Sequence, residues 1–202
     1  MKSDKREIRQ QQIETAAYEV LEQKGFAGAS MLAIAKAAKA SNETLYRWYG
    51  DKIGLFSALV EGNAAEVRQM LETGLEAQAD PMQILEDFAP ALLTLLLGDR
   101  AIALNRAAAA DSTGALGQAI SRSGREAIAP LISQVLEQAR ADGVLDFDIP
   151  QDAVSLFLDL LVGDQQIRRA IGQTKCPTPD EIARRATRAL SHFRLLLSPT
   201  DR

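Results

Sequence analysis

Four polar side chains near the N-terminus fall at helical spacing and could form hydrogen bonds to a partner. Asn42 and Glu43 are followed one turn later by Tyr46 and Arg47, which places all four on one face of a helix. Such side chains can donate to or accept from base edges in DNA, and an arginine can donate two hydrogen bonds to guanine. The segment therefore fits a base-reading helix, although short polar helices also occur in any helical bundle.

The distribution of charge bears on the same question. The chain has 202 residues and a formal net charge of −4, but residues 1–52 hold nine Lys and Arg against seven Asp and Glu. The remaining residues hold 14 against 20. An acidic body with a mildly basic N-terminal segment fits a protein that presents one end to a polyanion, and random fluctuation is the alternative explanation.

Residues suited to catalysis or metal binding are scarce. His192 is the only histidine and Cys176 the only cysteine, which excludes a His-rich metal centre, a multi-thiolate site and an internal disulfide framework. No Ser/His/Asp spacing recurs around His192, and no glycine-rich phosphate loop follows a strand. We therefore expect no enzymatic activity, no metal and no cofactor.

The composition is that of an ordinary globular protein, with 47% hydrophobic and 25% charged residues. The longest apolar stretch, residues 89–97, is too short to cross a membrane, and the polar N-terminus lacks the apolar core of a signal peptide. We expect a soluble, cytoplasmic protein without membrane contact.

Apolar periodicity along the whole chain, with only 5% aromatic residues, predicts an all-α fold of about nine helices. Ser30 and Ser41 are good N-caps, Gly25 lies where a helix-ending glycine is expected, and Thr178 to Glu181 form a capping box. Two short helices after a longer one have the layout of a helix-turn-helix, and they need the longer helix as a packing platform. The predicted helices span residues 5–24, 31–38, 42–49, 52–78, 81–97, 99–110, 115–141, 150–171 and 179–197.

A more specific pattern lies within residues 13–56. It consists of Ile13, Ala16, Ala17, Gly25, Phe26, Ser30, Ile34, Ala35, Ala38, Ser41, Thr44, Leu45, Tyr46, Tyr49, Asp51, Lys52, Leu55 and Phe56. This pattern resembles the N-terminal DNA-binding domain of the TetR/AcrR family of transcriptional regulators. The remaining predicted helices fit the length and layout of that family.

The chain departs from the family pattern in the turn between the two short helices. Members usually have glycine followed by a β-branched residue there, where this chain has Lys39 and Ala40. If the turn needs a left-handed backbone, Lys39 adopts it at a cost of about 1–2 kcal/mol. Otherwise the turn has a different shape, and in either case Lys39 could contact a phosphate.

The resemblance implies a DNA-binding domain over residues 1–52 and a ligand-binding and dimerisation domain over residues 53–202. The implied base readers are Asn42, Glu43 and Arg47. Phosphate or backbone contacts are implied for Ser30, Met31, Lys39, Thr44, Tyr46 and Lys52. Trp48 either lies on the sugar-phosphate backbone or rests on the fourth helix, and Tyr49 belongs to the core.

In the second domain, the last two long helices of the family pack against those of a second copy. The residues that this implies for the dimer interface are Leu156, Leu160, Ala186, Leu190 and Phe193, and packing within one chain is the alternative. An effector pocket enclosed by the fourth to eighth helices is also implied. Its candidate lining, which could equally be plain core, is Met70, Leu71, Leu75, Phe88, Leu92, Leu95, Leu104, Asn105, Ile128, Leu131 and Phe157.

The resemblance as a whole implies a one-component transcriptional repressor. It would bind a palindromic operator in double-stranded DNA as a homodimer and be released by a small apolar or amphipathic effector of unknown identity. Two alternatives remain open: a DNA binder of the same fold without an effector, and a helical interaction module that does not bind DNA.

Overall fold

The computed structural model describes residues 2–199, with side chains from residue 6 onward. It confirms the all-α fold, because the described residues form helices and contain no strand. The elements are α1 (Lys2–Gly28), α2 (Met31–Ala37), α3 (Asn42–Tyr49), α4 (Lys52–Glu76), α5 (Pro81–Leu97), α6 (Asp99–Ala110), α7 (Ala115–Ile120), a π-helical turn (Ser121–Arg125), α8 (Glu126–Ala141), α9 (Pro150–Val162), α10 (Gln165–Ala170) and α11 (Pro179–Leu196).

Most helix ends lie where local sequence signals place them. Ser30 and Ser41 cap α2 and α3, and the Thr178–Glu181 capping box opens α11. Gly25, with φ 65° and ψ 175°, interrupts the helical backbone of α1, as expected for the residue that ends the first regular helix.

Two of the long helices expected from the sequence are interrupted. The segment 115–141 contains the π-helical turn between α7 and α8, and the segment 150–171 breaks after α9. At the second break Gly163 has φ 53° and ψ −133°, a conformation that side-chain-bearing residues rarely adopt. The chain then starts the short helix α10, so the prediction of one continuous helix over 150–171 is wrong, whereas 115–141 stays helical through its π-helical turn.

The helices pack into two compact units. The N-terminal unit contains residues up to Gly62 together with Arg100–Gly124, and the C-terminal unit contains Asn63–Asp99 together with residues from Arg125 onward. The division therefore falls within α4 and differs from the boundary at residue 52 expected from the sequence. The reason is that Arg100–Gly124 packs with the N-terminal helices, a long-range contact that local sequence signals do not reveal.

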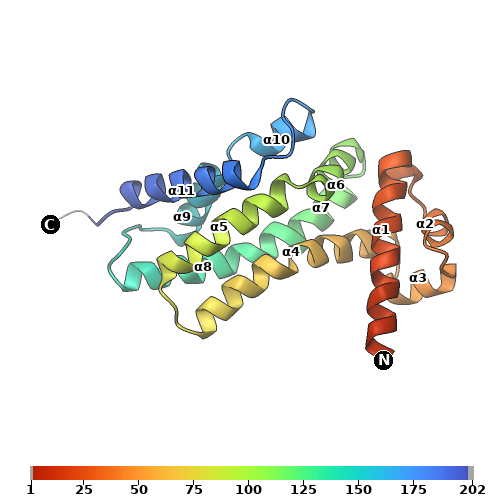
Figure 1. Cartoon of the computed structure of the whole chain (residues 1–202), viewed down its shortest axis with the longest axis horizontal. Coiled ribbons are helices and arrows are strands. Elements are labelled where there is room, and N and C mark those ends of the chain that lie inside the picture. Colours follow the sequence, from red (N-terminus) through yellow and green to blue (C-terminus); the bar gives the residue numbers. More distant parts are fainter. Residues whose placement is uncertain (1, 200–202) are drawn as a thin grey trace. The chain divides into compact units, whose positions relative to one another are not determined.

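The N-terminal unit is built around apolar side chains from α1, α2, α3 and the start of α4. Ile34 of α2 and Leu45 of α3 are fully buried, and the rings of Phe26 and Phe56 meet edge to face at 5.3 Å. α2 packs on α1 and α3 packs on α2 (Figure 1). This core supplies the platform that the two short helices need.

The C-terminal unit is a bundle of α5, α8, α9 and α11. α11 lies along α5 and α9, and α8 packs on both α5 and α9 (Figure 1). Three aromatic rings, from Phe88, Phe157 and Phe193, meet in its centre. In the part of the chain that the structure describes, no helix is both long and apolar enough to span a bilayer.

Candidate nucleic-acid interface

The helix-turn-helix is held at both of its helix starts by serine side chains. Ser30 Oγ accepts a hydrogen bond from the backbone N–H of Ala33 at 3.1 Å, and Ser41 Oγ accepts one from Thr44 at 3.0 Å. Each bond satisfies a backbone donor that the first turn of a helix leaves without a partner. The Thr44 and Ser41 hydroxyls are also hydrogen bonded to each other at 2.7 Å.

Helix α3 has one buried and one exposed side. Leu45 is buried in the N-terminal core, whereas Glu43 and Arg47 are exposed and Tyr46 is 49% exposed. Asn42 at the start of the helix is half-buried. Glu43, Tyr46 and Arg47 therefore offer hydrogen-bonding groups on the exposed side, as a base-reading helix requires, whereas the Asn42 Oδ1 is buried without a partner among the described residues.

The turn between α2 and α3 has the left-handed backbone that was one of two possibilities from the sequence. Lys39 has φ 51°, and its side chain is exposed. The Arg9 guanidinium from α1 donates to the carbonyl oxygens of Ala38 and Lys39, at 3.3 and 3.4 Å. Sequence reasoning did not identify Arg9 as a support of this turn, because the contact joins residues about thirty positions apart.

Because Lys39 is strained in this conformation, replacing it with glycine should stabilise the N-terminal unit. A left-handed backbone at a residue other than glycine lowers the stability of the folded state by about 1–2 kcal/mol. Glycine removes this strain, but its greater backbone freedom in the unfolded chain offsets part of the gain in stability. We expect Lys39→Gly to raise the free energy of unfolding by about 0.5–1 kcal/mol in urea titrations. Lys39→Ala keeps the left-handed strain and should have the free energy of unfolding of the wild type. Equal stability of Lys39→Gly and Lys39→Ala would contradict a strained backbone at this position.

Met31 and Lys52 both make contacts within the N-terminal unit. The Met31 side chain is 4% exposed and packs in the N-terminal core, so an approach of Met31 to DNA would be made by its backbone at the start of α2. Lys52 Nζ donates to the carbonyl oxygen of Phe26 at 2.9 Å and lies 4.0 Å from the Phe26 ring centroid. In this structure Lys52 therefore ties the end of α1 to the start of α4.

Trp48 and Tyr49 both pack partly against the N-terminal core. The Arg6 guanidinium lies 5.5 Å from the centroid of the Trp48 ring, in the geometry of a cation–π contact. The Tyr49 hydroxyl is buried and has no hydrogen-bond partner among the described residues. Burial, and after it the negative charge of Glu14, raises the pKa of Tyr49 to about 12, against a smaller lowering effect of Arg6.

Tyr49→Phe should therefore stabilise the protein slightly at neutral pH and more strongly at high pH. At pH 7 the substitution removes a buried hydroxyl that has no hydrogen-bond partner, which should raise the free energy of unfolding by about 1 kcal/mol. Between pH 10 and 12 the unfolded tyrosine loses its proton while the folded one keeps it, so wild-type stability falls as the pH rises. Urea unfolding at pH 7 and pH 11 should show the advantage of Tyr49→Phe growing with pH. The exposed Tyr46→Phe serves as the control, and an equal pH response of both variants would refute the account.

The residues expected to line an effector pocket do not converge on one site. Leu104 packs in the core of the N-terminal unit, whereas Phe88, Phe157 and Ile128 are buried in the core of the C-terminal unit. Leu71 and Leu92 are buried in that second core as well, and Leu75, Leu95 and Leu131 pack against it. Most of these residues are therefore core residues of their own unit, which was the alternative from the sequence. Met70 and Asn105 are half-buried.

The residues expected at the dimer interface fall into a buried group and a partly exposed group. Ala186, Leu190 and Phe193 are buried in the core of their own chain, so a second copy cannot reach these side chains. The alternative of packing within one chain holds for these three. Leu156 and Leu160 are partly exposed and remain candidates.

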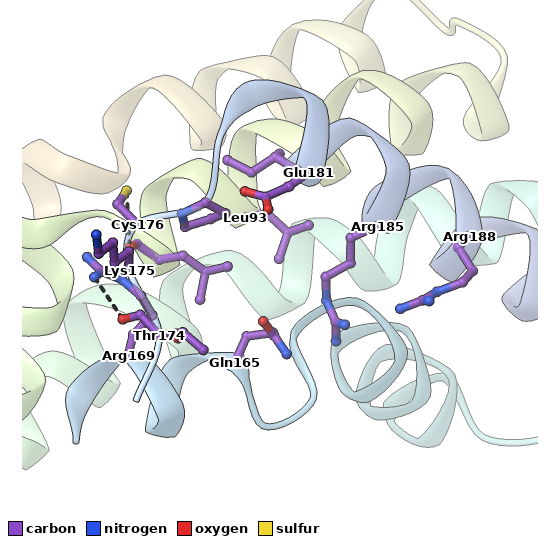
Figure 2. A pocket seen from close by; sticks show the side chains of 12 residues that line it. Leu93, Gln165, Arg169, Thr174, Lys175, Cys176, Glu181, Arg185 and Arg188 are labelled. Carbon is purple, nitrogen blue, oxygen red and sulfur yellow. Dashed lines mark hydrogen bonds between the residues drawn. The ribbon is translucent and has the colours of Figure 1, made fainter. Parts of the chain in front are cut away.

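A pocket of about 450 Å³ lies elsewhere in the C-terminal unit, between the end of α5, α10, the loop 171–178 and the N-terminal half of α11 (Figure 2). None of the eleven residues expected from the sequence lines it. Glu181, Ile182, Arg185 and Arg188 share one face of α11, a spacing that could have been noticed in the sequence. The position of α10 opposite these four residues could not have been noticed in the sequence.

Comparisons with known proteins agree with the observed architecture. Residues 13–59 match the family model of bacterial regulatory proteins of the tetR family, and residues 83–195 match that of the AefR-like transcriptional repressor C-terminal domain. A comparison with curated proteins finds no match.

Solved structures match over nearly the whole chain. A TetR transcriptional regulator from Agrobacterium tumefaciens is 30% identical, with 94% of each chain covered and a TM-score of 0.72. The flavonoid-responsive regulator FrrA is 29% identical, with 96% of this chain and 98% of that chain covered and a TM-score of 0.69. A TetR-family regulator from Mesorhizobium loti shares the fold at 24% identity, with 95% and 97% covered and a TM-score of 0.75.

The second family model alone covers more than half of the chain, and the Agrobacterium protein reaches 30% identity over nearly all of it. Proteins of this family are DNA-binding transcription factors and not enzymes. The chain, with its helix-turn-helix and its helical C-terminal unit, therefore belongs to the TetR family of bacterial transcriptional regulators.

Proposed function

We propose that the protein is a repressor that binds a palindromic operator as a homodimer and is released by a small effector. The observation that carries the proposal is the two-sided character of α3. Leu45 holds one side in the core, while Glu43, Tyr46 and Arg47 are exposed on the other. A helix held in this way can lie in the major groove with its N-terminal side chains against base edges.

The exposed side chains take different tasks in this complex. Arg47 donates to guanine, and Asn42 and Glu43 contact neighbouring bases. Tyr46 and Lys39 donate to phosphates on either side of the groove, which fixes the position of α3 without reading sequence. The N-terminus of α2, which Ser30 caps, faces the DNA backbone in this proposal, and its partial positive charge favours a phosphate there.

A dimer is needed because one short helix contacts too few bases to define an operator. Two copies of α3 must enter successive major grooves about 34–36 Å apart. We place the contact between copies on the exposed sides of α9 and α11, including Leu156 and Leu160. Both side chains are partly exposed, although they also pack against their own core.

The dimer contact can be tested by sedimentation velocity. We expect the wild type to be a dimer at micromolar concentration and the double variant Leu156→Glu/Leu160→Glu to be a monomer with unchanged helix content, because two carboxylates would be buried without partners. Leu32→Glu, on α2 of the N-terminal unit at a position that is 52% exposed, is the control outside α9 and α11 and should remain a dimer. A monomeric wild type would overturn the homodimer, and a dimeric double variant would move the interface elsewhere.

Control by a small molecule is supported by the pocket in the C-terminal unit and by the similarity to FrrA, whose name describes it as flavonoid-responsive. In this proposal the effector binds better to a conformation whose recognition helices are wrongly spaced for the operator, so that binding shifts the population away from DNA. The protein acts in the cytoplasm, where the chromosomal DNA lies.

The proposal is tested by selecting sheared genomic DNA on the purified protein at two salt concentrations and sequencing the bound fragments. We expect an enriched palindrome that persists at the higher salt, since base contacts depend less on salt than phosphate contacts do. Binding that disappears with salt and enriches no sequence would overturn the proposal and favour the interaction module.

A further inference from the structure

The pocket in the C-terminal unit has the volume of a small-molecule site, is partly open to solvent, and is lined by more polar and charged residues than apolar ones. Its volume of about 450 Å³ lies within the range of roughly 300–1,000 Å³ that is usual for such sites. The apolar side chains at its lining are Leu97, Pro177 and Ile182, of which Pro177 is half-buried and the other two are buried, together with Leu93, which is fully buried. Every lining residue belongs to the C-terminal unit, so the pocket does not depend on the N-terminal unit for its shape.

The polar lining of the pocket is mostly cationic. It contains Arg169, Lys175, Arg185 and Arg188. Figure 2 shows Arg169 and Lys175 at one end of the pocket, and Arg185 and Arg188 towards the other. The carboxylate among the described lining residues, that of Glu181, accepts hydrogen bonds from the backbone N–H and the hydroxyl of Thr178, at 2.7 and 3.1 Å.

Not all of these cations have a counter-charge within the protein. Arg169 is paired with Asp99 at 2.6 Å and also donates to the carbonyl oxygen of Leu97. In contrast, neither Lys175 nor Arg188 forms an ion pair within the described part of the chain. The pocket therefore carries positive charge that its own carboxylates leave uncompensated.

Arg185 is fixed in place at its end of the pocket. Its guanidinium donates to the carbonyl oxygens of Leu161 and Val162, the second at 2.9 Å, and so closes the C-terminus of α9. Burial, followed by the like charge of Arg188, lowers the pKa of Arg185, and Asp164 acts in the opposite direction. An anion bound beside both guanidinium groups would relieve this repulsion.

We propose that this pocket binds an anionic amphipathic ligand. Its carboxylate or phosphate group is bound by Arg188 together with Arg185, and its apolar part packs on Leu97, Pro177 and Ile182. The identification of this ligand as the effector rests on the function proposed above, whereas the binding site itself does not.

Cys176, the single cysteine, lines the pocket and is exposed, so its reaction with N-ethylmaleimide reports occupancy of the site. The full-length protein without DNA is titrated with decanoate, decyl phosphate and decylammonium. We expect one or both anions to slow the labelling of Cys176 in a saturable way and the cation to have no effect. Stronger protection by decyl phosphate assigns the ligand to phosphate esters, and stronger protection by decanoate assigns it to carboxylic acids.

Two variants of α11 test where in the pocket the anion binds. Arg188→Gln removes an exposed guanidinium of the pocket and should raise the concentration of anion needed for half protection about tenfold or more. Arg184→Gln removes an exposed guanidinium of the same helix outside the pocket and should behave as the wild type. Absence of protection by either anion, equal protection by decylammonium, or equal behaviour of the two variants would overturn the site.

The role of the ligand is tested separately on the DNA complex. Release of selected operator fragments by the protecting anion, with the same loss of potency in Arg188→Gln, supports the effector assignment. Protection of Cys176 without release of DNA leaves the binding site standing and overturns only that assignment.

Discussion

Replacing Phe157 with alanine is expected to lower the free energy of unfolding by about 3–5 kcal/mol. The Phe157 side chain is 1% exposed, stacks on Phe88 at 6.3 Å and meets Phe193 edge to face at 5.6 Å. Alanine would remove the central ring of this group and leave a cavity, because close-packed neighbours relax only in part. The three rings come from α5, α9 and α11, so the loss weakens the packing of all three helices.

Urea unfolding followed by circular dichroism measures this effect. Phe157→Leu keeps most of the apolar volume and should cost about 1 kcal/mol. Leu195→Ala, on the exposed side of α11, should stay within about 0.5 kcal/mol of the wild type. If Phe157→Ala were no more destabilising than Leu195→Ala, the ring would line an open cavity, as the resemblance first implied, and would not belong to the core.

Replacing Arg47 with alanine is expected to weaken operator binding by about 1–3 kcal/mol for each half-site. A symmetric dimer loses the contact twice, which gives roughly 30-fold or more in affinity. Arg47 lies on the exposed side of α3, while Leu45 anchors the other side, so the substitution should leave the fold intact. Binding to random DNA should change much less, because the lost interaction is with a base.

Fluorescence anisotropy on selected operator and on random duplexes separates these contributions. Arg122→Ala removes an exposed arginine of the same unit outside the helix-turn-helix and should leave the preference for operator unchanged. Tyr46→Phe removes only the hydroxyl that we propose to contact a phosphate, and it should weaken binding to both duplexes about equally. An equal loss on both duplexes for Arg47→Ala would mean that Arg47 contacts phosphates and does not read bases.

The helix-turn-helix was predictable because its signals are local. The serine caps at Ser30 and Ser41 and the helix-ending Gly25 act within three or four residues, and the structure has all three in those roles. Even the departure at Lys39 could be formulated from sequence, since a left-handed turn has a known cost for any residue with a side chain. The support of the turn by Arg9 could not be predicted from the sequence, because it depends on how α1 packs.

The break between α9 and α10 shows why the C-terminal unit was harder to predict. Apolar periodicity continues past Gly163, and one glycine costs a helix only about 1 kcal/mol, so the sequence favours a continuous helix. The break is stabilised by Arg185, which is more than twenty residues away in the sequence. Its guanidinium donates hydrogen bonds to the last carbonyl groups of α9. Arg185 also lines the pocket, whereas the candidate effector lining expected from the sequence followed from the family resemblance.

The central claim is that α3 reads base sequence, and it is tested most directly by comparing the DNA motifs selected by the wild type and by Arg47→Ala. The wild type should enrich a palindrome whose half-sites are about one helical turn apart. Arg47→Ala should lose the preference at one position, related by symmetry in both half-sites, and keep the others. An unchanged motif, or a loss spread evenly over all positions, would contradict base reading by α3.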